Sequence, residues 1–150
     1  MVERFVSAPL ELSPAILAGE FSRVDLVFYG VDHSGDSYEG RVYVNAPDAD
    51  VVMGRQVPSY VGSFHVFGHG GCFGDVGHCD VPSGPGRPFD LRPAHQLTPH
   101  TKVLIITESL RSILATGAHD PITVTVVAVA LGDASNDVLQ FDKVRLLTYQ

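Results

Sequence analysis

Side chains that bind transition metals are concentrated in one short segment of the sequence. Between His65 and Cys79 the chain holds three histidines and both of its cysteines. Imidazole and thiolate are the ligands that suit copper and zinc, whereas magnesium and calcium prefer oxygen. The segment therefore predicts a copper site, with zinc as the other suitable ion. Its candidate ligands are His65, His69, Cys72, His78 and Cys79.

The spacing of these residues sets a condition on such a site. An extended strand over 61–69 places Ser63, His65, Phe67 and His69 on one face and Phe64 and Val66 on the other. His65 and His69 are then about 13 Å apart along the strand, so both reach one ion only if the strand bends at Gly68. Five glycines between 68 and 77 make such a bend inexpensive. Further candidate ligands from other parts of the chain are His33, His95 and His100.

Two other interpretations of this segment stay open. The spacing C-x6-C with H-x3-H matches no standard zinc template. The segment could be an ordinary glycine-rich turn in which the histidines are only hydrogen-bonded. Alternatively, Cys72 and Cys79 could close a disulfide if the protein works outside the cytoplasm. A serine-nucleophile elbow (G-x-S-x-G) and a phosphate-binding loop are absent from the sequence.

Composition narrows the class of protein. The 150 residues are 45% apolar and 18% charged, which predicts one globular domain spanning 1–150. A net charge of −7 argues against binding to nucleic acid. The N-terminus shows no secretory signal, and no apolar run is long enough for a membrane span. We therefore expect a cytoplasmic protein that binds neither nucleic acid nor a membrane.

Alternating apolar residues indicate an all-β fold. Strands are expected at 24–29 and 38–45, joined as a hairpin by the turn 33–37, and at 61–69, 102–107, 122–131 and 138–149. One short helix is expected near 108–116, capped by Thr107 or Ser109 and stopped by Gly117. The Gly- and Pro-rich stretch 68–101 predicts a long loop. An antiparallel β-sandwich of Greek-key type explains this order best, although a closed barrel would give nearly the same string.

Several segments resemble a known family. The stretch 39–48 (EGRVYVNAPD), the stretch 60–64 (YVGSF) before a histidine-containing segment, and 101–107 (TKVLIIT) leading into Glu108 are similar to the C-terminal β-sandwich domain of the type-3 copper polyphenol oxidases and tyrosinases. The resemblance covers roughly residues 24–149. It implies a domain that sits over the dicopper site of a separate helical domain, shields the copper and keeps the enzyme latent.

The family's catalytic domain, with copper-binding histidines on a helix bundle, has no counterpart in this sequence. The expected function is therefore that of a copper-binding accessory, shielding or chaperone-like domain that serves a tyrosinase-type partner. One alternative is a small stand-alone copper-dependent oxidoreductase acting on a phenolic molecule, with the ion held by His65, His69 and His78. A metal-free binding module is the other alternative.

Overall fold

The structure of the chain is a computed structural model that describes residues 3–70, 79–80, 88–89, 97–117, 121–130 and 137–150. Within these ranges the chain forms seven strands and two helices. Their order is β1 (Arg4–Val6), α1 (Pro14–Leu17), β2 (Arg23–Val31), β3 (Tyr38–Val44), β4 (Tyr60–Val66), β5 (His100–Ile105), α2 (Thr107–Ala115), β6 (Val124–Ala130) and β7 (Lys143–Tyr149).

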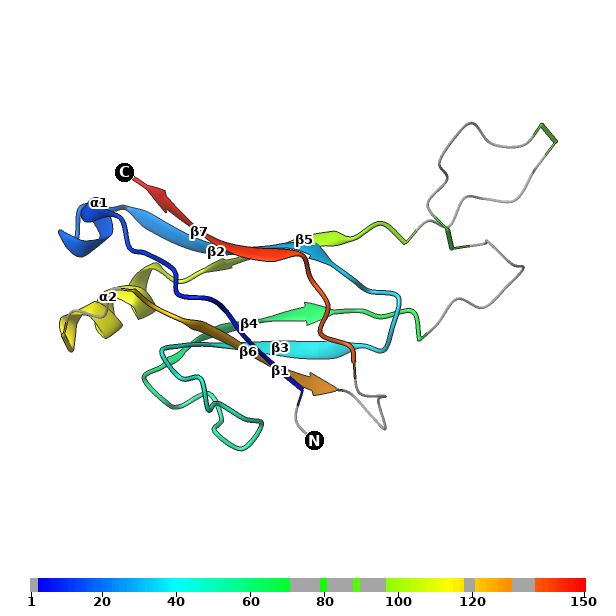
Figure 1. Ribbon diagram of the computed structural model, residues 1–150, viewed down its shortest axis with the longest axis horizontal. Helices are drawn as coiled ribbons and strands as arrows, with labels where there is room; N and C mark the ends of the chain where they lie inside the picture. The colour runs from blue at the N-terminus through cyan, green and yellow to red at the C-terminus, as the bar shows by residue number, and fades with distance from the viewer. Residues whose placement is uncertain (1–2, 71–78, 81–87, 90–96, 118–120, 131–136) are drawn as a thin grey trace.

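The strands form two layers that pack face to face (Figure 1). One sheet has the order β1-β6-β3-β4 and the other has the order β5-β2-β7. Every strand pairing in the described ranges is antiparallel. The predicted antiparallel β-sandwich is therefore confirmed. None of the helices in the part of the chain that the structure describes is long and apolar enough to cross a membrane.

Alternating residues of both sheets fill the space between the layers. Val24, Leu26 and Phe28 of β2 are completely buried. The Phe28 ring meets the Phe64 ring of the opposite sheet, with centroids 4.9 Å apart. At Gly40 a Cβ atom would lie 2.6 Å from the Phe64 ring, so only glycine leaves room for this contact. The burial of apolar area between the sheets is the main force that holds the two layers together.

The predicted hairpin between β2 and β3 is wrong. β2 pairs with β5 and β7, whereas β3 pairs with β4 and β6 in the other sheet. The segment between them therefore crosses from one layer to the other. An alternating pattern predicts a strand and its buried face, but it does not specify the neighbouring strand, because both strands here are central and have partners on either side.

Helix α2 lies where the sequence predicts the short helix, but its cap differs from the prediction. Ile106 precedes the helix, and no side chain caps the first turn. The Thr107 hydroxyl instead accepts a hydrogen bond from the Val24 backbone N–H at 3.0 Å, which ties the helix to β2. Two short elements, β1 and α1, were not predicted, because segments of three and four residues give too little periodicity to detect.

The last strand starts later than predicted, at Lys143. A carboxylate instead holds the residues before it. Glu3 accepts hydrogen bonds from the backbone N–H groups of Asp137, Val138 and Leu139, at 3.2, 2.9 and 2.7 Å. These contacts fix the segment before β7 against the N-terminus of the chain.

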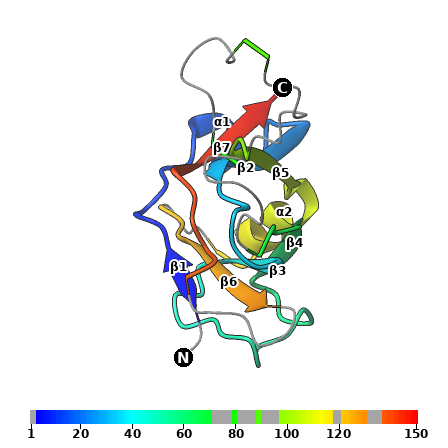
Figure 2. The ribbon, with the colours of Figure 1, turned by 90° about the vertical axis from the view of Figure 1, so that its right-hand side faces the viewer.

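The two ends of the sandwich carry different elements. Both helices lie at one end (Figure 1, left), whereas β2 and β4 finish, and β3 and β5 begin, at the opposite end. Figure 2 views the molecule from this second end. Loops gathered at one end of a sandwich are common places for binding sites.

Candidate functional site

Three histidines from separate parts of the chain meet at the end of the sandwich where β2 finishes and β5 begins. His33 follows β2, His69 follows β4, and His100 is the first residue of β5. The His33 and His100 rings are stacked, with centroids 4.0 Å apart and an interplanar angle of 18°. The His69 ring meets His33 edge-on at a centroid distance of 5.0 Å. We call these three residues the histidine cluster.

His33 is the buried member of the histidine cluster, with 6% of its surface exposed. Its Nε2 lies 2.8 Å from the carbonyl oxygen of Thr98. A carbonyl only accepts hydrogen bonds, so Nε2 carries the proton and the lone pair of the neutral ring is on Nδ1. This Nδ1 is buried and has no hydrogen-bond partner. A buried ring nitrogen without a partner is unusual and marks His33 as a candidate functional residue.

Backbone hydrogen bonds place His69 beside His33. The His69 backbone N–H donates to the His33 carbonyl oxygen at 3.0 Å, and the His69 Nδ1 lies 3.2 Å from the same oxygen. The next residue, Gly70, donates to the Gly35 carbonyl oxygen at 2.8 Å. The chain after β4 therefore runs along the turn that follows β2.

Gly68 permits this close approach. A Cβ atom at residue 68 would collide with the backbone of Gly35 and Asp36. The Gly68 N–H also donates to the Ser37 hydroxyl at 3.0 Å. The sequence predicts a bend at Gly68 for a metal site, and β4 does end just before it, at Val66. The contact that this bend creates is with the turn after β2.

The third member of the histidine cluster, His100, is exposed. Partial burial lowers the pKa of the His100 ring below its ordinary value of 6.5, and the neighbouring His33, Lys102 and His69 lower it further. A lowered pKa means that the ring is neutral at pH 7. The neutral ring offers a nitrogen lone pair, which a protonated ring lacks.

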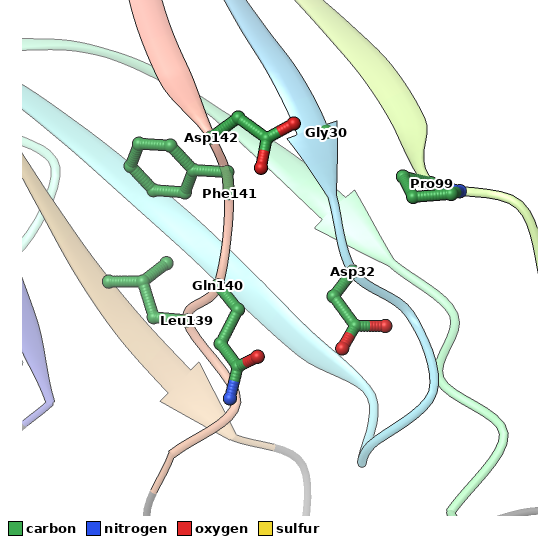
Figure 3. Close-up of a pocket in the computed structure, with 7 residues that line it drawn as sticks. All are labelled: Gly30, Asp32, Pro99, Leu139, Gln140, Phe141 and Asp142. Atoms are coloured by element: carbon green, nitrogen blue, oxygen red, sulfur yellow. The ribbon is translucent and has the colours of Figure 1, made fainter.

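An open pocket of about 620 Å³ is lined by Asp32 and Pro99, the residues that directly precede His33 and His100 in the chain (Figure 3). Asp142 lines it as well, whereas the neighbouring Phe141 ring packs against Phe28 in the core. The Asp32 carboxylate already accepts hydrogen bonds from the backbone N–H and hydroxyl of Ser34, at 2.8 and 2.9 Å. An ionised carboxylate accepts hydrogen bonds but donates none. A small ligand with hydrogen-bond donor groups would therefore suit this pocket.

The structure places the predicted metal ligands as follows. His69 belongs to the histidine cluster, whereas His65 is exposed and lies opposite Glu39 of the neighbouring strand. Cys72 and His78 lie outside the described residues. Cys79 is disulfide-bonded, and a disulfide sulfur has no thiolate to offer a metal ion. For Cys79 the disulfide alternative is therefore favoured over metal binding.

In the ranges that the structure describes, no three His, Cys, Asp or Glu side chains are arranged around a point that a metal ion could occupy. Two predicted ligands lie outside those ranges, so the copper site of the glycine-rich segment stays a prediction. The disulfide also bears on the expected cytoplasmic location, because disulfides persist in oxidising compartments. The location stays a prediction as well.

Two exposed aromatic side chains form a second group of candidate functional residues. Phe67 is 81% exposed and Phe89 is 97% exposed. Phe67 follows β4 directly and lies two residues before His69. Strand alternation predicts its exposure, because Phe64 and Val66 face the core. Aromatic side chains are enriched as anchors in protein interfaces, so each of these two rings is a candidate contact with another molecule.

The fold and these loop-borne side chains define a class of protein: a two-sheet antiparallel β-sandwich with candidate binding residues at one end. Solved structures of a polyphenol oxidase are similar to this chain in fold. Latent aurone synthase (polyphenol oxidase) from its natural source matches 98% of this chain with a TM-score of 0.53 and 14% sequence identity. The recombinant latent enzyme, alone or co-crystallised with hexatungstotellurate(VI), matches with TM-scores of 0.53 and 0.54 at 15% identity.

The matched region is 24% of the length of those chains. The resemblance to a polyphenol oxidase domain is therefore confirmed at the level of the fold. No model of a protein family matches the sequence, and no curated protein matches it.

Proposed function

We propose that this chain is a shielding domain that docks on a type-3 copper catalytic domain and restricts access to its copper site. The observation that carries the proposal is the location of Phe67. This ring is 81% exposed and lies at the end of a sandwich whose fold matches part of a latent polyphenol oxidase. A projecting apolar ring can fill the mouth of a substrate cavity and exclude water from it.

Two exposed rings suit a protein partner of this kind. Phe67 and Phe89 are 81% and 97% exposed and each offers an apolar anchor. An aromatic anchor surrounded by polar residues is the usual arrangement at the centre of a protein interface. A phenolic substrate cavity is lined by apolar and aromatic groups, so a phenyl ring fits it chemically.

A chimeric enzyme tests the proposal. In latent aurone synthase, the matched sandwich region would be replaced by this chain, and catechol oxidation would be measured before and after proteolytic removal of the sandwich. Tethering keeps the effective concentration of the domain high, so weak docking is still detected. We expect at least about tenfold lower activity before proteolysis, which corresponds to about 1.4 kcal/mol in favour of the covered state.

Two variants of the chimera locate the contact. Phe67→Ala is expected to raise the activity before proteolysis to the level reached after it. Val52→Ala is the matched control, because Val52 is 85% exposed but belongs to the segment between β3 and β4. A folded, copper-loaded chimera with full activity before proteolysis would show that the proposed shielding is wrong. The same activity in both variants would show that Phe67 is not the contact.

The alternative of a stand-alone copper-dependent oxidoreductase stays a prediction. It requires oxidation of a phenol by the isolated chain, which can be measured as oxygen uptake with the same purified protein.

A further inference from the structure

We propose that His33 and His100 bind a transition-metal ion that prefers imidazole ligands, with His69 beside them. This site uses residues from three separate parts of the fold, and only His69 belongs to the glycine-rich segment. The proposal goes beyond the shielding function and does not depend on it, because metal binding is measured on the isolated chain.

The first support is the state of the His33 ring. Its Nε2–H donates to the Thr98 carbonyl oxygen at 2.8 Å, and its Nδ1 is buried without a partner. Histidines that bind metals usually donate their other ring N–H to a carbonyl or carboxylate, which fixes the tautomer and the direction of the lone pair. The contact with Thr98 therefore gives the neutral His33 ring the tautomer of a ligand, with its lone pair on Nδ1.

The buried Nδ1 of His33 also favours a ligand. Leaving a buried polar atom without a partner is unfavourable, and native proteins avoid it. A bound ion would satisfy the Nδ1 of His33. The donor set is imidazole, which suits Cu²⁺ and Zn²⁺ and does not suit Mg²⁺ or Ca²⁺.

His100 supplies the second ligand after a change of side-chain rotamer. In the stacked arrangement the two rings are nearly parallel, so their lone pairs do not converge on one point. His100 is exposed, and exposed side chains change rotamer within nanoseconds. The ring centroids are 4.0 Å apart, so the proposal requires the His100 side chain to rotate out of the stack and bring one of its nitrogens toward an ion at His33.

Charged side chains near the histidine cluster act on an incoming cation in opposite directions. Lys102 opposes an incoming cation, whereas the carboxylates of Asp32 and Asp36, in the same turn as His33, attract it.

Metal titration of the isolated chain tests the proposal. The chain would be prepared without a histidine tag or reductant, stripped with a chelator and titrated calorimetrically with Cu²⁺, Zn²⁺ and, as a negative control, Mg²⁺. His100→Ala removes a proposed ligand at an exposed position, and His65→Ala is the matched control because His65 is also an exposed histidine. We expect His100→Ala to weaken binding of Cu²⁺ or Zn²⁺ by at least about tenfold and His65→Ala to leave it unchanged.

Spectroscopy gives a second readout that does not depend on affinity. The Cu²⁺ complex is expected to show nitrogen hyperfine coupling from two imidazoles, reduced to one in His100→Ala. No binding by the wild-type chain would overturn the proposal, and so would equal affinity in the wild type and His100→Ala. Loss of binding in His65→Ala alone would overturn it in favour of the glycine-rich segment. If the isolated chain binds no metal but the chimera has low activity before proteolysis, the metal site is wrong and the shielding function stands. The two outcomes can be told apart because the two measurements are separate.

Discussion

Two buried tyrosines on the same strand provide a matched test of how this core treats its polar atoms. Tyr38 and Tyr43 both belong to β3 and are 1% and 0% exposed. The Tyr43 hydroxyl donates to the Gly54 carbonyl oxygen at 2.9 Å, whereas the Tyr38 hydroxyl is buried without a partner. Substitution of each tyrosine by phenylalanine removes only this oxygen. The structure therefore predicts opposite effects on stability.

The magnitudes follow from the hydrogen-bond inventory. Tyr43→Phe loses a hydrogen bond, which lowers the free energy of unfolding by about 1 kcal/mol. Tyr38→Phe removes a hydroxyl that loses its water on folding and gains nothing in return, so it raises the free energy of unfolding by about 1 kcal/mol. With an unfolding entropy of about 2.1 cal/mol/K per residue, each change shifts the melting temperature by roughly 3 °C, in opposite directions.

Alkaline pH provides an independent arm of the same test. Burial raises the pKa of the Tyr38 hydroxyl, and the nearby Glu3 and Asp32 raise it further. The unfolded chain ionises this group above its ordinary pKa of 10.0 while the folded chain does not, so stability falls as the pH rises above that value. The difference between the wild type and Tyr38→Phe should grow by about 1.4 kcal/mol for each pH unit in this range.

Denaturant unfolding of the wild type and the two variants, at pH 7 and pH 11, measures all of these values. Circular dichroism at pH 7 confirms that each variant keeps the strand content of the wild type. A Tyr38→Phe variant that is destabilised as much as Tyr43→Phe would refute the reasoning, because it would mean that the Tyr38 hydroxyl makes a stabilising interaction.

Two further predictions concern the buried carboxylate of Glu39 in the four-stranded sheet and the turn next to the histidine cluster. Burial would raise the pKa of Glu39, but the Ser63 hydrogen bond and the guanidinium groups of Arg41 and Arg55 outweigh it and lower the pKa. The ionised Glu39 therefore stabilises the fold above its ordinary pKa of 4.5, and this stabilisation is lost as the pH falls below that value. Glu39→Gln should lower the free energy of unfolding by about 1–2 kcal/mol at pH 7 and by less at pH 3, as measured by urea unfolding. Gly68→Ala should cost about 1–3 kcal/mol, because its Cβ would collide with the Gly35 backbone, whereas Gly35→Ala, which meets nothing within 4 Å, should change stability little. An equal cost for the two glycine variants in thermal unfolding would contradict the close approach of the two segments.

The sequence determined the elements that have a long, clear period. The alternation of Val24, Leu26 and Phe28 predicted the strand, although Asp25 and Val27 on its other face are buried as well. In β4 the alternation separated the buried Phe64 and Val66 from the exposed His65. The exposure of Phe67 followed from that alternation. The alternation of apolar and polar residues along a strand depends only on which side chains avoid water. It can therefore be read from the sequence without knowing which strands are neighbours.

The partners of each strand could not be predicted in this way. Adjacent strands with a turn between them usually form a hairpin, yet β2 and β3 belong to different sheets. Each of the two strands instead contributes buried apolar residues to the core between the sheets, Val24, Leu26 and Phe28 from β2 and Val42 and Val44 from β3. Thr107 shows the same effect of tertiary structure at a single residue. Its hydroxyl, a candidate helix cap in the sequence, instead accepts a hydrogen bond from the Val24 backbone N–H of β2.

The histidines separate what the sequence indicates from what the tertiary structure decides. The density of histidine, cysteine and glycine between His65 and Cys79 is a property of the sequence, and it indicated metal-binding chemistry there. Only the fold brought His33 and His100, which are 67 positions apart in the numbering, to a ring separation of 4.0 Å. The reason is physical: β2 and β5 are antiparallel neighbours, so the end of one strand and the start of the other meet at the same edge of the sheet. Residue types can be counted along a chain, but a binding site depends on which strands pair.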